Sequence, residues 1–186
     1  MTGLKRPLTG LLIFSLLSGA SLAVNREALI FREVLGLYTT GQYPYALALL
    51  DRFEKNSKIT LPQLMLVSGY VYEVSGRFAE AERFLNLSWG ALKGMDMVRA
   101  AVEDAAIRAF ALENGVGGSV VVDLALRGST GEGRCYLLFN SWLIKRELGL
   151  EEALEGEEFL SDCRGVWFYP LMAEYRLHRP SQTPRR

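Results

Sequence analysis

Two stretches of the chain share one pattern of glycine, aromatic, alanine and leucine positions. Residues 41–50 read GQYPYALALL, and residues 76–85, 35 positions later, read GRFAEAERFL. Apolar and aromatic positions upstream align as well: Ile30 with Met65, Phe31 with Leu66 and Leu37 with Tyr72. Each copy predicts a helix with apolar residues three and four positions apart, a turn with glycine, and a second amphipathic helix. Such a pair cannot bury its own apolar face, so the pattern predicts stacked pairs.

The same rhythm continues beyond residue 92, although the motif decays. Residues 95–115, MDMVRAAVEDAAIRAFALENG, predict a helix that ends at Gly115. Long and short amphipathic stretches then alternate, and residues 165–178 predict a last helix that caps the exposed end of the stack. We therefore predict an all-α fold, an α-α superhelix, with units at about residues 26–58, 61–93, 95–128 and 132–163.

The repeated unit resembles the tetratricopeptide repeat family, whose hallmark is a helix-turn-helix unit of about 34 residues. The matches in the first copy are Gly41, Tyr43 and Ala46, and those in the second are Gly69, Tyr72, Gly76, Phe78, Ala81 and Ser88. The first copy departs from the family's preference for a small residue at Val34 and Phe53 and for an aromatic one at Leu37. The resemblance covers residues 26–92, about a third of the chain, and is weaker beyond. Together with the continuing rhythm, it predicts a helical repeat domain over residues 24–178.

In tetratricopeptide proteins the first helix of each pair lines a concave groove, and the resemblance implies the same here. The residues that would line it are Phe31, Leu35, Tyr38, Gln63, Leu66, Tyr70 and Glu73. Versions that clamp a peptide carboxylate use Lys, Arg and Asn at such positions, and this chain has none there. The implied groove is apolar and aromatic and suits a peptide segment or helix with apolar anchors. In the alternative, these residues contact neighbouring repeats or the N-terminal helix fills the groove.

The N-terminus predicts export. Residues 1–23 combine Lys5 and Arg6 with an apolar middle and small residues before a cleavage site after Ala23, which is typical of a secretory signal peptide. The alternative is a retained membrane anchor, which would be the chain's contact with a membrane. Cleavage leaves 19 basic against 21 acidic residues, which argues against a nucleic-acid partner. The other end, residues 179–186, reads RPSQTPRR and predicts a disordered tail.

The two cysteines have two interpretations. An exported chain meets oxidising conditions in which Cys135 and Cys163 could pair. Two buried free thiols fit the sequence equally well, because spacing alone does not establish proximity. The sequence therefore leaves the disulfide open.

One stretch combines a β-branched run with several glycines, as a strand followed by a phosphate-binding loop would. It covers residues 119–135, SVVVDLALRGSTGEGRC. A P-loop needs Lys and then Ser or Thr after its last glycine, and this chain has Arg134 and Cys135 there. Glu132 would also add a carboxylate beside the phosphates. We interpret the stretch as containing an ordinary turn between helices.

Catalytic and metal chemistry finds little support in the sequence. The single histidine, His178, would have to serve any Cys-His or zinc site, and two cysteines with one histidine fall short of a structural zinc set unless a carboxylate completes it. An acidic group is strung along one predicted helix as a solvated face: Glu151, Glu152, Glu155, Glu157 and Glu158. No nucleophile, base and orienting group can be assembled, so we predict no enzyme, no cofactor and no metal.

These observations together predict an exported, non-catalytic scaffold in the periplasm or a similar extracytoplasmic space. It would bind a protein or peptide partner through the groove. The alternative is a small-ligand carrier or accessory subunit of an extracytoplasmic transport system, with a cavity between repeats. A second aromatic group, Trp167, Phe168 and Tyr169, predicts either packing against the last repeat or an exposed docking patch.

Overall fold

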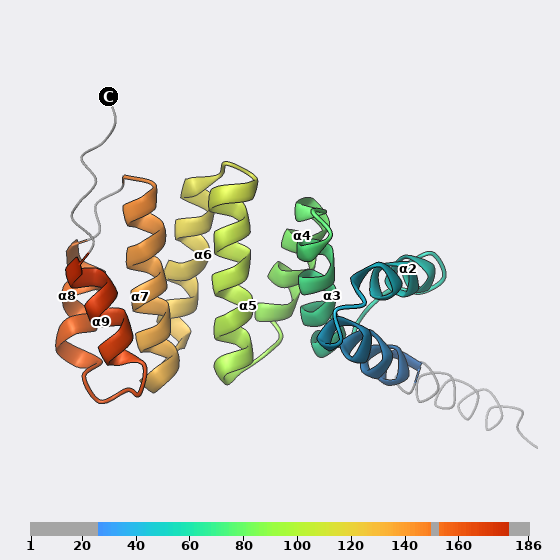
Figure 1. Cartoon of the computed structure of the whole chain (residues 1–186), viewed down its shortest axis with the longest axis horizontal. Coiled ribbons are helices and arrows are strands. Elements are labelled where there is room, and N and C mark those ends of the chain that lie inside the picture. Colours follow the sequence, from blue (N-terminus) through green and yellow to red (C-terminus); the bar gives the residue numbers. More distant parts are fainter. Residues whose placement is uncertain (1–25, 150–152, 179–186) are drawn as a thin grey trace, which may run out of the picture.

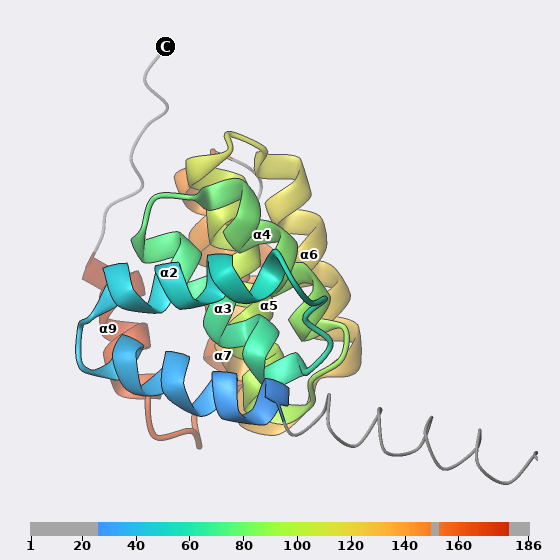
Figure 2. The same ribbon diagram turned by 90° about the vertical axis from the view of Figure 1, so that its right-hand side faces the viewer.

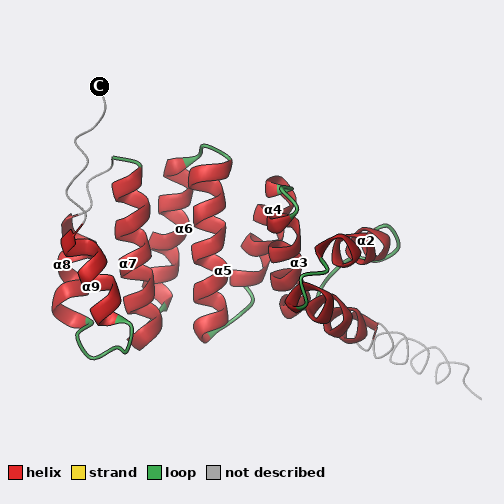
Figure 3. Cartoon of the chain, viewed as in Figure 1, coloured by secondary structure: helices red, strands yellow, loops and turns green. Residues whose placement is uncertain are grey.

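The structure is a computed structural model that describes residues 26–149 and 153–178. These residues form helices joined by turns, and no strand occurs among them (Figure 3). The predicted signal peptide and C-terminal tail lie outside the described residues. A first helix covers residues 26–39 and is followed by α2 (Tyr43–Glu54), α3 (Pro62–Val74), α4 (Phe78–Trp89), α5 (Gly94–Ala106), the π-helical η1 (Ile107–Ala111), α6 (Gly115–Gly128), α7 (Gly131–Glu147), α8 (Ala153–Asp162) and α9 (Tyr169–His178).

The helices follow one another in chain order along the long axis of the molecule (Figure 1). The first helix and α2 lie at one end and α8 and α9 at the other, and the first two helices stand in front when the stack is seen end-on (Figure 2). Each helix from α3 to α7 packs against its successor. The predicted all-α superhelix is therefore confirmed. Within the described ranges, no helix combines the length and apolar character needed to cross a bilayer.

The two aligned glycines make the same turn. Gly41 and Gly76 have φ angles of +73° and +72°, which place both in the left-handed region that glycine adopts without strain. After α3, the Arg77 amide donates to the Tyr72 carbonyl and the Gly76 amide to the Glu73 carbonyl, the Schellman arrangement. The amides of residues 42 and 41 donate to the carbonyls of residues 37 and 38 in the same way. The repeated glycine thus fixes the angle at which each second helix leaves the first.

The core consists of three neighbouring clusters rather than one centre. The first lies among the first helix and α2 to α5, the second among α5 to α7, and the third between α7 and the C-terminal helices. In the first cluster the Tyr72 and Phe84 rings stack with centroids 5.5 Å apart. Gly69 allows α3 and α4 to approach closely, because a Cβ there would lie 2.6 Å from Cγ of Leu85. The stack is thus held by contacts between successive helices, as in a repeat protein.

In the third unit, the turn between the two helices begins earlier than predicted. The helix predicted through residue 115 ends at Ala111, and Gly115 begins α6. Glu113, with φ of +54°, takes the left-handed conformation in place of the glycine. The side chain of Asn114 then accepts a hydrogen bond of 2.9 Å from the Gly117 amide and caps α6. The prediction was wrong here because a glycine after an apolar helix was interpreted as its end.

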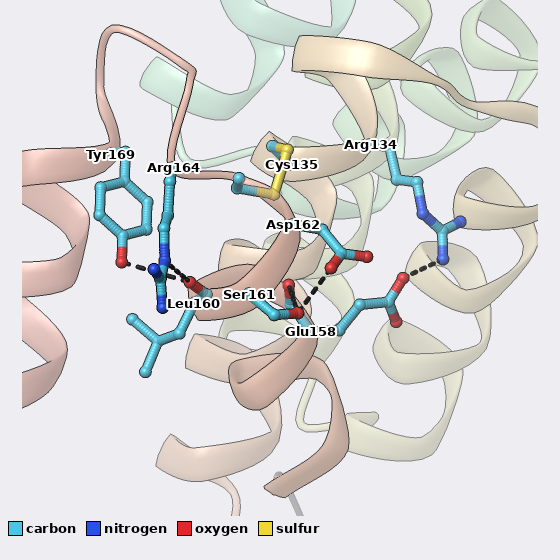
Figure 4. Close-up of a disulfide and its surroundings, with 9 residues drawn as sticks. Arg134, Cys135, Glu158, Leu160, Ser161, Asp162, Arg164 and Tyr169 are labelled. Carbon is cyan, nitrogen blue, oxygen red and sulfur yellow. Dashed lines mark hydrogen bonds and ion pairs between the residues drawn. A yellow bond between two sulfur atoms is a disulfide. The ribbon is translucent and has the colours of Figure 1, made fainter.

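A disulfide ties the C-terminal helices to α7. Cys135 on α7 and Cys163, just after α8, are joined with Cα atoms 5.6 Å apart (Figure 4). Both residues are buried, and Phe159 and Phe168 belong to the same apolar cluster. The bond therefore resolves the choice that the sequence left open. It also fastens the connection between α8 and α9 to the stack.

The acidic residues of α8 are only partly a solvated face. Glu155 forms an ion pair with Lys145, and Glu158 forms one with Arg134 (Figure 4 shows the second pair). Glu157 is exposed as expected. Residues 151 and 152 lie outside the described residues. The two pairs link α8 back to α7, so this part of the prediction was wrong.

Replacing both cysteines by alanine should lower the free energy of unfolding by about 2–4 kcal/mol, because the bond closes a loop in the unfolded chain. The bonded residues are 28 positions apart. The measurement is urea unfolding followed by circular dichroism, with and without reductant. Reductant should destabilise the wild type and leave the variant unchanged. Equal unfolding curves for the wild type in both conditions would contradict the prediction.

Candidate functional site: a tyrosine and glutamate cluster

The residues predicted to line the groove fall into three groups. Phe31 and Leu66 are half-buried and pack against the first core cluster, so much of their surface serves the stack. Leu35 is 38% exposed and Gln63 is exposed. The remaining three, Tyr38, Tyr70 and Glu73, come together where the first helix and α3 end.

The tyrosines form an aromatic group that links two helix pairs. The rings of Tyr38 and Tyr70 stack with centroids 6.0 Å apart and planes 26° apart. Tyr43, at the start of α2, lies against Tyr38 with centroids 5.5 Å apart. Tyr38 and Tyr70 are both half-buried and pack against the first core cluster. Two residues that are 32 positions apart in the sequence thus form one surface.

Two carboxylates stand beside these rings. Glu73 follows Tyr70 by one helical turn on α3, and Glu103 comes from α5. Burial raises the pKa of Glu73, and the charge of Glu103 raises it further. Burial also raises the pKa of Glu103. The charge of Glu103 on α5 thus acts on Glu73 on α3, and burial disfavours the charge of both.

The tyrosines respond to the same charges. The pKa of Tyr70 is raised, first by burial and then by the charge of Glu103. The pKa of Tyr38 is raised by burial, by Tyr43 and then by Glu73 and Glu103. Both hydroxyls are therefore protonated at neutral pH. We call Tyr38, Tyr70, Glu73 and Glu103 the tyrosine-glutamate cluster.

Neither carboxylate of the cluster has a hydrogen-bond or ion-pair partner among the described residues. Every other buried or half-buried carboxylate in that part of the chain has one: Glu27, Asp51, Glu54, Glu80, Glu82, Asp104, Asp123, Glu155 and Glu158. Asp104 illustrates the contrast, because it is fully buried and accepts from Trp89 at 3.1 Å and from Arg108 at 2.9 Å. The two carboxylates without a partner lie in the same place.

Two further charged residues of α5 reach the cluster. Arg99 lowers the pKa of Tyr70 and Asp96 raises it, and both side chains are exposed. Arg99 precedes Glu103 by four positions on α5, yet the two form no ion pair. Glu73, Glu103 and Asp96 together outweigh the one charge of Arg99. The cluster is therefore a net negative surface beside aromatic rings, an arrangement that attracts cations.

Sequence reasoning found three members of the cluster and missed Glu103. The resemblance was applied to the first two units only, because the motif decays after residue 92. A usable signal was present: Asp96, Arg99 and Glu103 are spaced so that they share one face of a predicted first helix. Extending the groove to the third unit would have placed Glu103 next to Glu73.

In the second aromatic group, Trp167, Phe168 and Tyr169, two side chains pack against the helices and one is exposed. Phe168 is buried, with its ring edge-on to Tyr136 at 5.9 Å. Tyr169 stacks on Phe159 at 5.4 Å. Trp167 is 76% exposed. His178 ends α9, and its side chain lies outside what the structure describes.

The double variant Glu73→Gln and Glu103→Gln should be more stable than the wild type at pH 7, by about 0.5–1 kcal/mol, the scale of charge effects near a protein surface. The raised pKa values mean that folding disfavours the charged carboxylates. The advantage should shrink as pH falls from the raised folded pKa values to the ordinary glutamate value of about 4.3 in the unfolded chain, below which the wild-type carboxyls are protonated in both states. Urea unfolding at pH 7 and pH 4 measures it. A destabilised variant at pH 7 would show that the carboxylates have stabilising partners.

Comparison with known proteins assigns this chain to no family. The chain matches no protein-family model, no curated protein and no solved structure. The helical-repeat architecture therefore rests on the structure itself, and the function is argued from the residues.

Proposed function

We propose that this chain is an exported, non-catalytic scaffold of the tetratricopeptide-repeat type that binds a protein or peptide partner. The partner would lie along the solvent-facing side of the first helix, α3 and α5, which we call the first-helix face. The observation that carries the proposal is the tyrosine-glutamate cluster. Its aromatic and charged groups come from three successive units. Neither of its two carboxylates forms a hydrogen bond or an ion pair with another described residue. Such a surface suits an external ligand better than internal packing.

The stack suits this role because it is rigid before any partner binds. Matching Schellman turns after the first helix and after α3 fix the pair geometry, and the core clusters join each pair to the next. A preorganised receptor loses little conformational entropy on binding, so most of the cost of ordering falls on the partner. Leu35, one turn before Tyr38, adds an exposed apolar contact on the same helix.

Export is part of the proposal and has two supports. The first 23 residues follow the pattern of a signal peptide. The disulfide between Cys135 and Cys163 is of a kind that persists in oxidising compartments. Both supports favour the periplasm or a similar extracytoplasmic space.

The test is an affinity pull-down from the native extracytoplasmic fraction with the mature protein and with the double variant Leu35→Ala and Tyr38→Ala. The variant removes exposed contact area and should retain at least about tenfold less partner, since anchors of this kind contribute about 1–2 kcal/mol to binding. Circular dichroism should show both proteins folded.

The matched control is Val120→Ala with Leu124→Ala, which removes exposed apolar side chains from α6 instead. The control should retain the partner as the wild type does. A partner lost equally with both variants, or with the control alone, would contradict the assignment to the first-helix face. Retention of only a small organic ligand would favour a carrier instead.

A further inference from the structure

We propose that the partner segment is basic: a lysine or arginine side chain of an extended peptide lies against Tyr38 and Tyr70 and beside Glu73 and Glu103. This inference rests on the proposed function, because it specifies the chemistry of the partner that the first-helix face takes. It is argued from three features of the surface: the unpaired carboxylates, the tyrosine rings without an arginine over them, and the apolar flank.

Charge complementarity is the first feature. Glu73 and Glu103 are half-buried without a basic partner, whereas the comparable carboxylates in the described part of the chain are paired. A cation placed near both would gain from two charges at once in surroundings partly shielded from water. The surplus of carboxylates over Arg99 argues against an acidic segment or a nucleic acid.

The lack of an arginine over the tyrosine rings is the second feature. Elsewhere this chain covers aromatic faces with its own arginines: Arg26 over Phe53, Arg77 over Tyr72, Arg83 over Phe84 and Arg146 over Trp142, with guanidinium carbons 4.4 to 5.4 Å from the ring centroids. Among the residues that the structure describes, no arginine covers Tyr38 or Tyr70 in this way. Elsewhere in the molecule, cations pair with carboxylates and lie over aromatic rings. The cluster lacks both contacts, and a partner's cation would supply both.

The apolar flank is the third feature and favours a peptide over a small free cation. Leu35 is exposed one turn from Tyr38, and Phe31 is half-buried one turn further along the same helix. A lone cation would leave this surface unused. An extended segment with a basic residue at the cluster and apolar residues three to four positions away would use both.

The test uses a random dodecapeptide library displayed on phage and selected on the disulfide-bonded mature protein, without any prior choice of sequence. Enriched peptides are synthesised, and their affinities are measured by fluorescence anisotropy against the wild type and against Glu73→Gln with Glu103→Gln. The matched control is Glu157→Gln with Glu174→Gln, which makes the same charge change at exposed residues of α8 and α9. A Tyr38→Ala variant reports whether a peptide occupies the first-helix face at all.

Enriched peptides should contain lysine or arginine, and they should bind the Glu73 and Glu103 variant at least tenfold more weakly than the wild type or the control. Changing the basic residue to glutamine should cause a similar loss, and added salt should weaken binding to the wild type more than to the variant. Peptides that lose affinity with Tyr38→Ala but show no basic enrichment would overturn this inference and leave the proposed function standing. Peptides indifferent to Tyr38, or no enrichment at all, would count against both.

Discussion

Burial of one apolar face by each helix pair is the constraint on which the rest of the structure depends. A single pair leaves that face in water, so successive pairs must stack, and the stack needs a constant angle within each pair. The glycine turns at Gly41 and Gly76 supply the angle, and Gly69 supplies the close approach of α3 to α4. Stacking in register also aligns the first helices of successive pairs. Residues 38, 70 and 103 therefore share one surface although they are far apart in the chain.

The charged groups of this protein show two different outcomes of burial. Asp104 is fully buried, and its desolvation is offset because Trp89 and Arg108 donate hydrogen bonds to it. It thereby serves the packing of α4 on α5. Glu73 and Glu103 are half-buried, so they are partly desolvated, and no such donors among the described residues bind them. Uncompensated charge of this kind lowers stability, and proteins keep it where an external group completes the site. The ligand proposed above would supply the donors that the fold does not give to the tyrosine-glutamate cluster.

The sequence predicted what depends on local spacing and missed what depends on contact between elements. Helical periodicity and the aligned glycines gave the all-α superhelix, because the repeated turn needs the same left-handed residue each time. The turn at Glu113 and Asn114 escaped prediction because another residue took the left-handed conformation. Glu103 was missed because its neighbour in the cluster, Glu73, lies 30 positions away in a unit with a clearer motif.

The C-terminal helices also depend on contacts that local spacing does not predict. The pairing of Glu155 with Lys145 joins α8 to α7, and nothing in the spacing of the acidic residues indicates it. The same holds for Cys135 and Cys163, whose spacing was compatible with free thiols as well as with a bond. Of Trp167, Phe168 and Tyr169, only Trp167 is left largely exposed, a division that depends on how the α8–α9 connection packs.

The most direct test of the central claim is a pH titration of the Glu73 and Glu103 side-chain carboxyl carbons by NMR in the folded, disulfide-bonded protein. Unpaired, half-buried carboxylates should titrate above the ordinary glutamate value of about 4.3, and each should shift when the other is changed to glutamine. Two carboxyls that titrate at or below that value, independently of each other, would show that they are solvated or paired. The cluster would then lose its reason to attract a cation.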